Sequence, residues 1–489
     1  MSAEYVEARS GAYADSVTLM QVSAAARKAD GVEAALVAMA TELNLGLLPG
    51  MGFGAPPQAG PNDLLIAVRA RDDTALAGAL AVVETALTAR PDDAGAAGPT
   101  NSRPRTTATA IRDTGPGLAL VSVPGRFAFA EAMDALQAGC DVMIFSDNVP
   151  VEQEIALKDA ANELDLLVMG PDCGTAIVGG VGLGFSHSLP AGPIGLVAAS
   201  GTGAQQVLCL LAHAGAGVRA ALGVGGRDLS AAVRGRSART ALAALDDDPG
   251  TELILVISKP PAAEVADAVR DYAAGLATPV LFAFTGPGQP DLTAAAEQTL
   301  RAAGLPVPDW PHWAPDQERP TRPGVLRGLF AGGTLCDEAM VIAGERLGQP
   351  VRSNIPLRPD LQLAPGGMFI PQHVMIDFGD DELTRGRPHP MIDQTLRLEK
   401  LTTWATDPAV AVFLLDVVLG YGAHPDPAAE LAPAIATVPQ PVVVSLIGAP
   451  SDPQDVTRQA GQLRAAGAHV FASNAAATRY ACALIASAQ

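Results

Sequence analysis

The chain has 489 residues, enough for two or three domains that each bury a core of their own. Its formal net charge of −20 argues against binding to nucleic acid or to an anionic membrane surface, because both need clustered lysine and arginine. The five cysteines form no C-x-x-C pair, so neither a disulfide framework nor a zinc ribbon is indicated. We expect a cytoplasmic protein with no signal peptide and no membrane span.

Apolar runs alternate with helical stretches through the first part of the chain. The expected strands are residues 118–123, 142–145 and 166–169, and the expected helices are residues 127–138 and 151–163. Continuous apolar strands between helices are typical of a parallel sheet that is covered on both faces. Residues 5–87 show the same alternation. Residues 90–107 are rich in Pro, Gly, Ala, Ser and Thr and are expected to be flexible.

Two further units each begin with a strand, a glycine-rich turn and a helix. Their expected strands are residues 194–198, 252–258 and 280–284 in one unit, and residues 325–330, 411–417 and 442–446 in the other. The sequence Leu-Arg-Ala-Ala-Gly at residues 300–304 recurs at residues 463–467. In both places it follows an apolar strand that begins with Pro-Val. The shared order of elements indicates a duplication.

Ser200-Gly201-Thr202-Gly203 and Gly332-Gly333-Thr334 each lie where a buried strand meets the start of a helix. The unpaired N–H groups and the dipole of a helix start attract anions, and glycine lets the anion approach the backbone. Glycine in such a turn can also serve only a tight strand-to-helix connection. Two turns in equivalent places favour a phosphate that is shared between two facing helix starts.

Two more glycine-rich turns follow apolar runs. Gly225 and Gly226 precede Arg227, whose planar fork suits a carboxylate or a phosphate, although a solvated arginine in a plain turn is the alternative. The turn at residues 170–175 follows a parallel strand at the end where open α/β sheets bind ligands. Within it, Cys173 is either a nucleophile or, as is more common, a packed thiol.

The densest polar cluster covers residues 377–390. Asp377, Asp380 and Asp381 could ligate Mg²⁺, or they cap and solvate the loop. Arg387, with His389 between Pro388 and Pro390, forms a rigid polar segment that we assign to the orientation of a carboxylate substrate, with packing of one domain on another as the alternative. Asp416 lies within an apolar run and therefore requires a partner or a ligand.

These motifs resemble the succinyl-CoA synthetases. From Val121 to about Leu305 the chain is similar to the α subunit, whose glycine turns correspond to the turns at residues 170–174, 200–202 and 223–226. From about Val325 onwards it resembles the carboxyl domain of the β subunit, with Gly332-Gly333-Thr334 at the opposing helix start. Over nearly its whole length the chain is identified as a member of the FdrA family. The motifs that carry this identification are residues 145–149, 169–175, 225–230, 258–261 and 386–393.

The resemblance implies an α/β fold with a Rossmann-like, CoA-binding-type domain over residues 1–188. Two flavodoxin-like, ligase-type parallel-sheet domains are then expected over residues 189–322 and 323–489. The family motifs imply site residues beyond the phosphate-binding turns. These are Asn148, Cys173, Gly174 and Lys259 for substrate binding, and Asp172 and Arg227, together with Arg387 and His389, for catalysis.

Three departures from the synthetases bear on the reaction. The loop that carries their phosphate-relaying histidine corresponds to residues 285–293, which contain no histidine. The glutamate that steadies the phosphohistidine corresponds to Ser258-Lys259. The glycine fingerprint for the CoA phosphates corresponds to residues 10–16, which contain one glycine. Because these closely spaced glycines are missing, CoA binding is not expected. No ATP-grasp domain is evident. No cofactor or metal is assigned beyond the magnesium that the acidic cluster allows.

FdrA proteins resemble the subunit implicated in oxamate carbamoyltransferase, which converts oxalurate and phosphate into oxamate and carbamoyl phosphate in allantoin catabolism. The resemblance implies a transferase that binds a small carboxylate and phosphate or carbamoyl phosphate within a hetero-oligomer of separately encoded subunits. One alternative is an NDP-forming acyl-CoA synthetase that works with a separate ATP-grasp partner. Another is a metabolite-binding scaffold without enzymatic activity.

Overall fold

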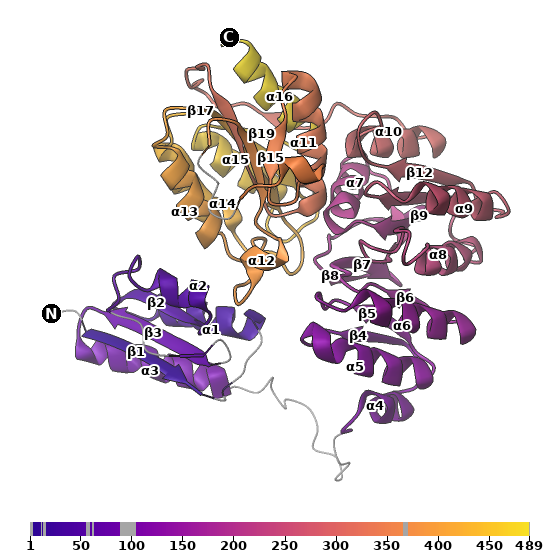
Figure 1. Cartoon of the computed structure of the whole chain (residues 1–489), viewed down its shortest axis with the longest axis horizontal. Helices are drawn as coiled ribbons and strands as arrows, with labels where there is room; N and C mark the ends of the chain where they lie inside the picture. Colours follow the sequence, from indigo (N-terminus) through magenta and orange to yellow (C-terminus); the bar gives the residue numbers. More distant parts are fainter. Residues whose placement is uncertain are drawn as a thin grey trace. The chain divides into compact units, whose positions relative to one another are not determined.

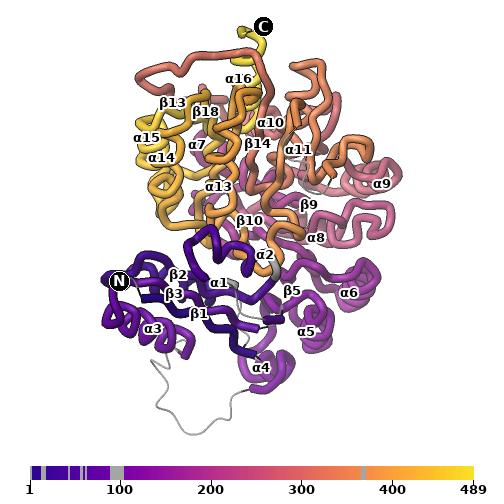
Figure 2. Tube along the Cα trace, turned by 60° about the vertical axis from the view of Figure 1, so that its left-hand side comes forward, coloured from indigo at the N-terminus to yellow at the C-terminus, as the bar shows by residue number. Residues whose placement is uncertain are grey.

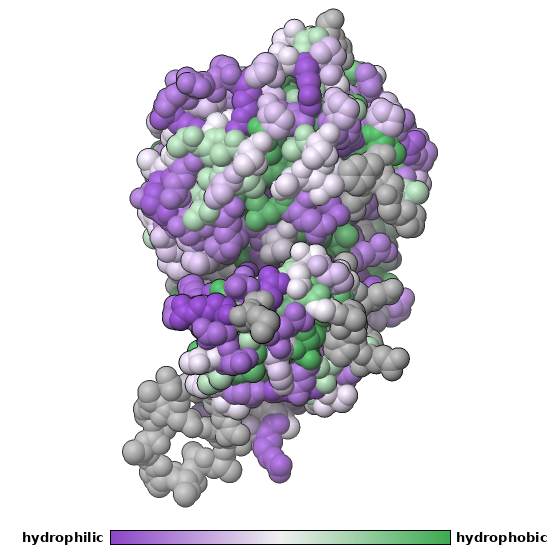
Figure 3. Space-filling view, turned by 90° about the vertical axis from the view of Figure 1, so that its left-hand side faces the viewer, coloured by the Kyte–Doolittle hydropathy of each residue, from purple (hydrophilic) through white to green (hydrophobic). Residues whose placement is uncertain are grey.

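The computed structural model describes residues 3–10, 12, 16–54, 59–60, 63–88, 104–364 and 370–488. The chain forms two compact units. Unit 1 consists of Met1–Arg103 and Asp381–His389, and unit 2 consists of Pro104–Asp380 and Pro390–Gln489. Figure 1 shows the helices and strands of both units with the labels used below. Among the described residues, no helix combines the length and the apolar character that crossing a bilayer requires. On the face shown in Figure 3, hydrophilic and hydrophobic residues alternate in small groups.

Unit 1 contains an antiparallel sheet of three strands in the order β1-β3-β2. Its elements are β1 (Ala3–Arg9), α1 (Ser16–Lys28), β2 (Val32–Met39), α2 (Glu42–Leu47), β3 (Leu64–Ala70), α3 (Asp73–Thr88) and α12 (Asp381–Thr384). Ile66 and Val68 of β3 pack with α1 and α3, whereas Leu65 and Ala67 pack with Leu48 and Phe53 on the other face. Alternate residues of the central strand are therefore buried on opposite faces.

The expectation that residues 5–87 continue the parallel alternation is wrong. β1 and β2 run in the same direction, but β3 lies between them and runs antiparallel to both. The misassignment has a physical cause, because a central strand buried on both faces has the same continuous apolar sequence in either orientation. The expected single domain over residues 1–188 is also divided, since unit 1 takes its first part. Of the segment expected to be flexible, residues 90–107, the part from 90 to 103 lies outside the described residues.

Unit 2 begins with a parallel sheet of three strands in the order β4-β5-β6. Its elements are α4 (Thr107–Thr114), β4 (Leu118–Val121), α5 (Gly125–Gln137), β5 (Asp141–Ile144), α6 (Val151–Glu163) and β6 (Val168–Met169). The strands and helices predicted over residues 118–169 are confirmed, with ends that differ by up to two residues. Figure 2 shows α5 and α6 beside β5 along the chain trace.

The second sheet of unit 2 has the order β12-β11-β9-β10-β7-β8. Its elements are β7 (Thr175–Val178), β8 (Val181–Gly184), β9 (Ala191–Ala199), α7 (Gly201–His213), β10 (Val218–Gly223), α8 (Arg236–Asp246), β11 (Leu253–Ser258), α9 (Ala263–Ala273), β12 (Val280–Phe284) and α10 (Leu292–Ala302). β9 to β12 are parallel, and β7 and β8 form an antiparallel hairpin at the edge. The hairpin lies before residue 188, so the expected boundary there divides this sheet.

The third sheet has seven strands in the order β13-β19-β18-β17-β14-β16-β15, of which only the edge strand β13 is antiparallel. The strands are β13 (His312–Trp313), β14 (Val325–Phe330), β15 (Val351–Ser353), β16 (His373–Asp377), β17 (Val410–Val418), β18 (Val442–Ile447) and β19 (Ala468–Phe471). The helices are α11 (Gly333–Leu347), η1 (Pro359–Leu361), α13 (Thr395–Trp404), α14 (Pro427–Thr437), α15 (Val456–Ala465) and α16 (Asn474–Ala486).

The first long parallel strand has the same position in the strand order of the second and third sheets. β9 lies between β10 and β11, and β14 lies between β16 and β17, so each strand that leads into a glycine turn is central. In the second sheet the order β10-β9-β11-β12 is that of flavodoxin-like sheets, and the third sheet repeats it as β16-β14-β17-β18-β19, with β15 added at the edge. In such sheets ligands bind at the carboxyl edge beside the first strand. The α/β fold with parallel sheets is confirmed, and the boundary at residue 322 stays a prediction.

Candidate functional site

Two helix starts face each other within unit 2. α7 begins after Ser200 at the end of β9, and α11 begins after Gly332 at the end of β14. The hydroxyl of Ser200 donates to the hydroxyl of Thr334 at 2.8 Å and accepts from the N–H of Gly203 at 3.1 Å. The structure therefore brings together the two turns that the sequence predicted as a pair, which we call the helix-start pair (Ser200–Gly203 and Gly332–Thr334).

The glycines of α11 are required by this close approach. A Cβ atom on Gly332 would lie 2.6 Å from the Cγ2 atom of Thr202, and a Cβ atom on Gly333 would lie 2.8 Å from Oδ2 of Asp377. Within the described part of the chain, the N–H groups of Gly201, Thr202, Gly333 and Thr334 donate to no protein atom. Unpaired N–H groups at two adjacent helix starts make a region of positive potential that suits an anion.

Lys259 adds a cation beside the helix-start pair. It follows the last residue of β11, the strand next to β9, and its Nζ atom lies 3.0 Å from Oδ2 of Asp337 on α11. Its side chain remains 40% exposed. Burial works against the ammonium charge, but Asp337 and Asp377 outweigh it, so the pKa of Lys259 is raised. Lys259 thus stays charged near neutral pH.

Asp377 is a buried acid at the end of β16, next to Gly333. Its Oδ1 atom accepts from the N–H of Gly379 at 2.9 Å, and its backbone is held by Asn354. The pKa of Asp377 is raised to about 7, mainly by burial, with Asp416 and Asp337 adding to the rise and Gly379 and Lys259 opposing it. Near neutral pH this carboxyl group can therefore hold or release a proton.

Asp416 has the partner that its burial requires. The Nη1 atom of Arg397 donates to Oδ1 of Asp416 at 2.6 Å, and both side chains are buried. Asp416 also accepts from the N–H groups of Ala331 and Gly332 at 2.7 and 3.0 Å, so it fixes the turn that begins α11. The sequence predicted a partner for Asp416 without identifying it. Arg397 and Asp337 were missed because their partners lie far away in sequence, and the need of Asp416 for a cation was the only signal for Arg397.

A second group of predicted site residues gathers at the carboxyl end of β10, the strand next to β9. β10 and β9 are neighbours, and Gly225, with φ of +89°, packs against the carbonyl oxygen of Pro171, where a Cβ atom would lie only 2.6 Å away. The turn at residues 170–174, the loop at residues 223–228 and the residues after β5 thus form one group, which we call the glycine-loop group. It contains Asn148, Asp172, Cys173, Gly174, Gly225, Gly226 and Arg227.

A buried network holds this glycine-loop group in place. Lys158 of α6 donates to Glu154, Asp228 and the carbonyl oxygen of Val224 at 2.8 to 2.9 Å. Asp228 accepts from the N–H groups of Ser237 and Ala238 and thereby caps α8. Arg227 pairs with Glu154 at 2.9 Å and donates to the carbonyl oxygen of Val149. Arg227 is therefore anchored to α6, and its catalytic assignment stays a prediction.

Cys173 is a packed thiol in this structure. Its side chain is buried, and burial raises its pKa to about 12, with Asp172 adding to the rise. A thiol that stays protonated at neutral pH is a poor nucleophile. Of the two alternatives for Cys173, the structure favours the packed thiol. Asn148 and Asp172 are exposed and adopt positive φ angles of 53° and 57°.

Arg387 and His389 belong to unit 1. In their segment Asn44 donates through Nδ2 to the carbonyl oxygen of Gly386, which also approaches Thr41 closely. These contacts agree with the alternative in which the segment packs on the N-terminal unit. Substrate orientation by Arg387 and His389, and magnesium binding by Asp377, Asp380 and Asp381, stay predictions. In the segment compared with the CoA fingerprint, residues 11 and 13–15 lie outside the described residues.

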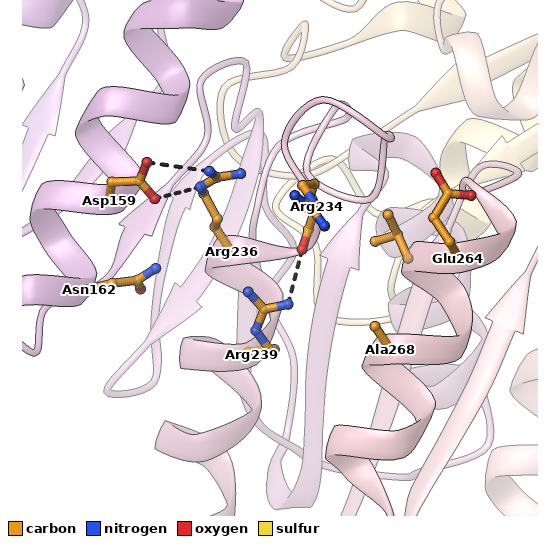
Figure 4. A pocket seen from close by; sticks show the side chains of 8 residues that line it. Asp159, Asn162, Arg234, Arg236, Arg239, Glu264 and Ala268 are labelled. Carbon is orange, nitrogen blue, oxygen red and sulfur yellow. Dashed lines mark hydrogen bonds and ion pairs between the residues drawn. The ribbon is translucent and has the colours of Figure 1, made fainter.

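Two pockets lie away from the helix-start pair. A pocket of about 320 Å³ is lined by Pro260, Pro261 and Thr285 and follows the strand ends of β11 and β12. Figure 4 shows another, of about 360 Å³, between α6, α8 and α9. In it Arg236 pairs with Asp159 at 2.6 Å, and Arg239 donates to the carbonyl oxygen of Arg234. Two of its three arginines therefore already use protein acceptors.

Two family matches cover separate parts of the chain. Residues 1–104 match the family described as AllF, heavy metal-associated domain, and residues 329–484 match the CoA-ligase family. The second match includes Gly332–Thr334. The fold and this match define an α/β protein with parallel-sheet domains of the CoA-ligase type. Residues 1–104 contain neither cysteine nor histidine, so they do not fit a site built from the ligands that soft and borderline metals prefer.

The chain belongs to the FdrA/YahF-type family. It is 41% identical over 440 residues to the uncharacterized protein YahF of Escherichia coli (strain K12), a match that covers 85% of this chain and 84% of that protein. It is 31% identical over 156 residues to the ADP-forming succinate–CoA ligase subunit alpha of Aquifex aeolicus (strain VF5), which covers 31% of this chain and 50% of that protein.

Among solved structures, the chain is similar to the dinucleotide-forming acetyl-coenzyme A synthetase 1 of Ca. Korarchaeum cryptofilum in complex with phosphate and ADP. The two are 15% identical with a TM-score of 0.30, and the match covers 76% of this chain and 84% of that chain. A second similar structure is the ATP citrate lyase of Methanothrix soehngenii in complex with citrate and coenzyme A, with 18% identity and a TM-score of 0.32. That match covers 41% of this chain and 37% of that chain.

The raised pKa of Asp377 predicts how stability depends on pH. Its folded pKa of about 7 lies above the value of about 3.9 in an unfolded chain. Its contribution to stability is therefore complete below about pH 4 and is lost as the pH rises through about 7. The variant Asp377→Asn cannot ionise, so its free energy of unfolding should fall less than that of the wild type between pH 5 and pH 8. The expected difference is roughly 2–3 kcal/mol.

Urea unfolding of the full chain at pH 5, 6, 7 and 8 measures this difference. The exposed Asp271→Asn, which removes a carboxylate from α9, is the matched control and should follow the wild type. Parallel curves for wild type and Asp377→Asn over the whole range would show that Asp377 is ionised throughout.

Proposed function

We propose that the helix-start pair holds inorganic phosphate or the phosphoryl group of carbamoyl phosphate. The observation that carries this proposal is the set of unpaired N–H groups at two adjacent helix starts, with the Lys259 ammonium beside them. Both features stabilise a phosphate dianion without a covalent intermediate. In the synthetases that the chain resembles, the phosphate is relayed through a histidine, and residues 285–293 contain none.

We propose that the reaction is transfer of a carbamoyl group between phosphate and a small ureido carboxylate, with oxalurate as the substrate. An oxygen of phosphate attacks the ureido carbonyl carbon, and the bond from that carbon to the oxamate nitrogen breaks. The nitrogen takes up one proton from Asp377, which regains one from the attacking hydrogen phosphate, and the products are carbamoyl phosphate and oxamate. The helix-start pair and Lys259 position the phosphate, and Asp377 supplies the proton from a carboxyl group that is protonated near neutral pH.

The remaining site residues keep the tasks that the family motifs imply for them. Asn148, Asp172, Gly174 and Arg227 of the glycine-loop group bind or activate the ureido substrate. Arg387 and His389 orient its carboxylate. We further propose that the chain acts with separately encoded partner subunits, because its succinate–CoA ligase relatives are themselves named as alpha subunits.

Thr202→Val tests the phosphate site. Valine keeps the side-chain volume against Gly332 but deletes the hydroxyl, so the affinity for inorganic phosphate should fall by about 1–3 kcal/mol if that oxygen contacts the anion. Isothermal titration of the full chain with inorganic phosphate measures the change. Thr437→Val, an exposed threonine on α14, is the matched control. Equal affinities in wild type and Thr202→Val would move the phosphate site away from this helix start.

Arg387→Lys tests the assignment of the substrate carboxylate. Lysine keeps the positive charge but loses the planar pair of donors, so kcat/KM for oxalurate should fall by roughly tenfold or more. The assay is formation of carbamoyl phosphate from oxalurate and phosphate by the complex purified from native extract. If the variant complex is intact and its kcat/KM is unchanged, the segment serves packing alone. If the wild-type complex forms no carbamoyl phosphate, the carbamoyl-transfer proposal itself fails.

The CoA-ligase match over residues 329–484 favours a second candidate, an NDP-forming acyl-CoA synthetase with a separate ATP-grasp partner. The two candidates differ in their affinity for CoA. Residues 10–16 hold one glycine, so few backbone N–H groups can approach a pyrophosphate there. We therefore expect calorimetric titration of the full chain with CoA to show no binding tighter than millimolar. Micromolar binding would select the synthetase.

A further inference from the structure

A buried histidine, cysteine and aspartate come together in unit 2, away from the helix-start pair. His187 lies between β8 and β9, Cys209 lies on α7, and Asp452 lies between β18 and α15. One ligand atom from each of the three lies within 4.8 Å of the others, and all three side chains are less than 5% exposed. Cys209 is eight residues after Gly201, which places it about 12 Å along α7 from the helix start.

The hydrogen bonds of Asp452 define the state of the imidazole. Asp452 accepts from the N–H of Ala449 at 2.7 Å and from the N–H of Ser188 at 2.8 Å, and its Oδ2 atom lies 2.7 Å from Nδ1 of His187. A carboxylate that accepts from backbone donors is an acceptor toward the ring as well, so Nδ1 carries the proton. In the neutral imidazole, Nε2 of His187 is then the nitrogen that has its lone pair available.

That nitrogen is buried and has no partner among the described residues. A buried polar atom without a hydrogen bond costs about 1–3 kcal/mol, so proteins seldom retain one without a reason. An aspartate that holds Nδ1 while Nε2 stays open is the arrangement in which histidines bind zinc. Cys209 offers a sulfur ligand within 4.8 Å of the ligand atoms of His187 and Asp452.

We propose that His187 and Cys209 bind one zinc ion, with Asp452 as the carboxylate that orients the imidazole. Zinc prefers a combination of sulfur and nitrogen ligands in a buried structural site. The thiol gives up its proton as the metal–sulfur bond forms, so zinc replaces one proton and the carboxylate of Asp452 balances part of the remaining charge. Burial of all three residues excludes a substrate and makes the site structural.

His213 lies one helical turn beyond Cys209 on α7. It follows Cys209 by four positions, so both side chains lie on the same face of α7. Its Nε2 atom contacts the carbonyl oxygen of Gly448 at 3.0 Å, one residue before the Ala449 that bonds to Asp452. The proposed ion therefore joins α7 of the six-stranded sheet to the loop after β18 of the seven-stranded sheet. It thereby fixes the position of α7, whose first turn belongs to the helix-start pair.

Metal analysis of the full chain, purified without a polyhistidine tag from zinc-supplemented medium, tests the proposal. We expect about one zinc per chain in the wild type and in Cys482→Ser, whose buried cysteine on α16 lies outside the cluster. Cys209→Ser and His187→Gln should lose zinc. Asp452→Asn should bind zinc roughly 10–100-fold more weakly, because it removes the carboxylate that orients the imidazole.

A cobalt measurement keeps the test decisive if a buried variant fails to fold. The wild-type chain stripped of metal and titrated with Co²⁺ should show a thiolate-to-cobalt charge-transfer band, and chelation should lower its Tm. Wild-type chain that contains no zinc and shows no such band with Co²⁺ would overturn the site. Zinc that remains in a folded Cys209→Ser variant would overturn it as well.

Discussion

The buried ion pair between Arg397 and Asp416 is the constraint on which the site of unit 2 depends. Removing two charges from water costs several kcal/mol per ion, and good geometry with further hydrogen bonds must offset that cost. Asp416 meets this requirement through Arg397 and through the N–H groups of Ala331 and Gly332. Arg397 also donates to the carbonyl oxygen of Leu329 and to Gln394. The pair thus fixes the backbone that leads from β14 into α11.

With that backbone fixed, the local electrostatics of the site differ from those of the whole chain. The chain carries a net charge of −20, yet one edge of its parallel sheets presents two helix starts and an ammonium group. Asp337, Asp377 and Asp416 lie around the same point, and burial raises the pKa of each of them. An anion at the helix starts competes with these carboxylates for Lys259, so proton uptake by Asp377 and anion binding favour each other.

The central strands and the helices between them could be predicted because their apolar runs are long and bounded by glycine or proline. β12 and β14 begin and end at the predicted residues. The orientation of β3 could not be predicted, because its run of five apolar residues is compatible with either direction. At the site, the glycine turns could be predicted because backbone conformation is coded locally. Arg397 and Asp337 could not be predicted, because their ion-pair partners lie 19 and 78 positions away, respectively. His187, Cys209 and Asp452 are separated in the same way.

Both helix starts of the pair belong to one polypeptide. Residues 303–324 connect α10 to β14 and so tie the sheet that carries α7 to the sheet that carries α11. In the synthetases that the chain resembles, the corresponding helix starts come from an α and a β subunit. Because the two helix starts are covalently connected here, their association is intramolecular and does not depend on the protein concentration. The effective concentration of one helix start near the other is on the order of millimolar. Dilution of the chain therefore leaves the two halves of the helix-start pair together.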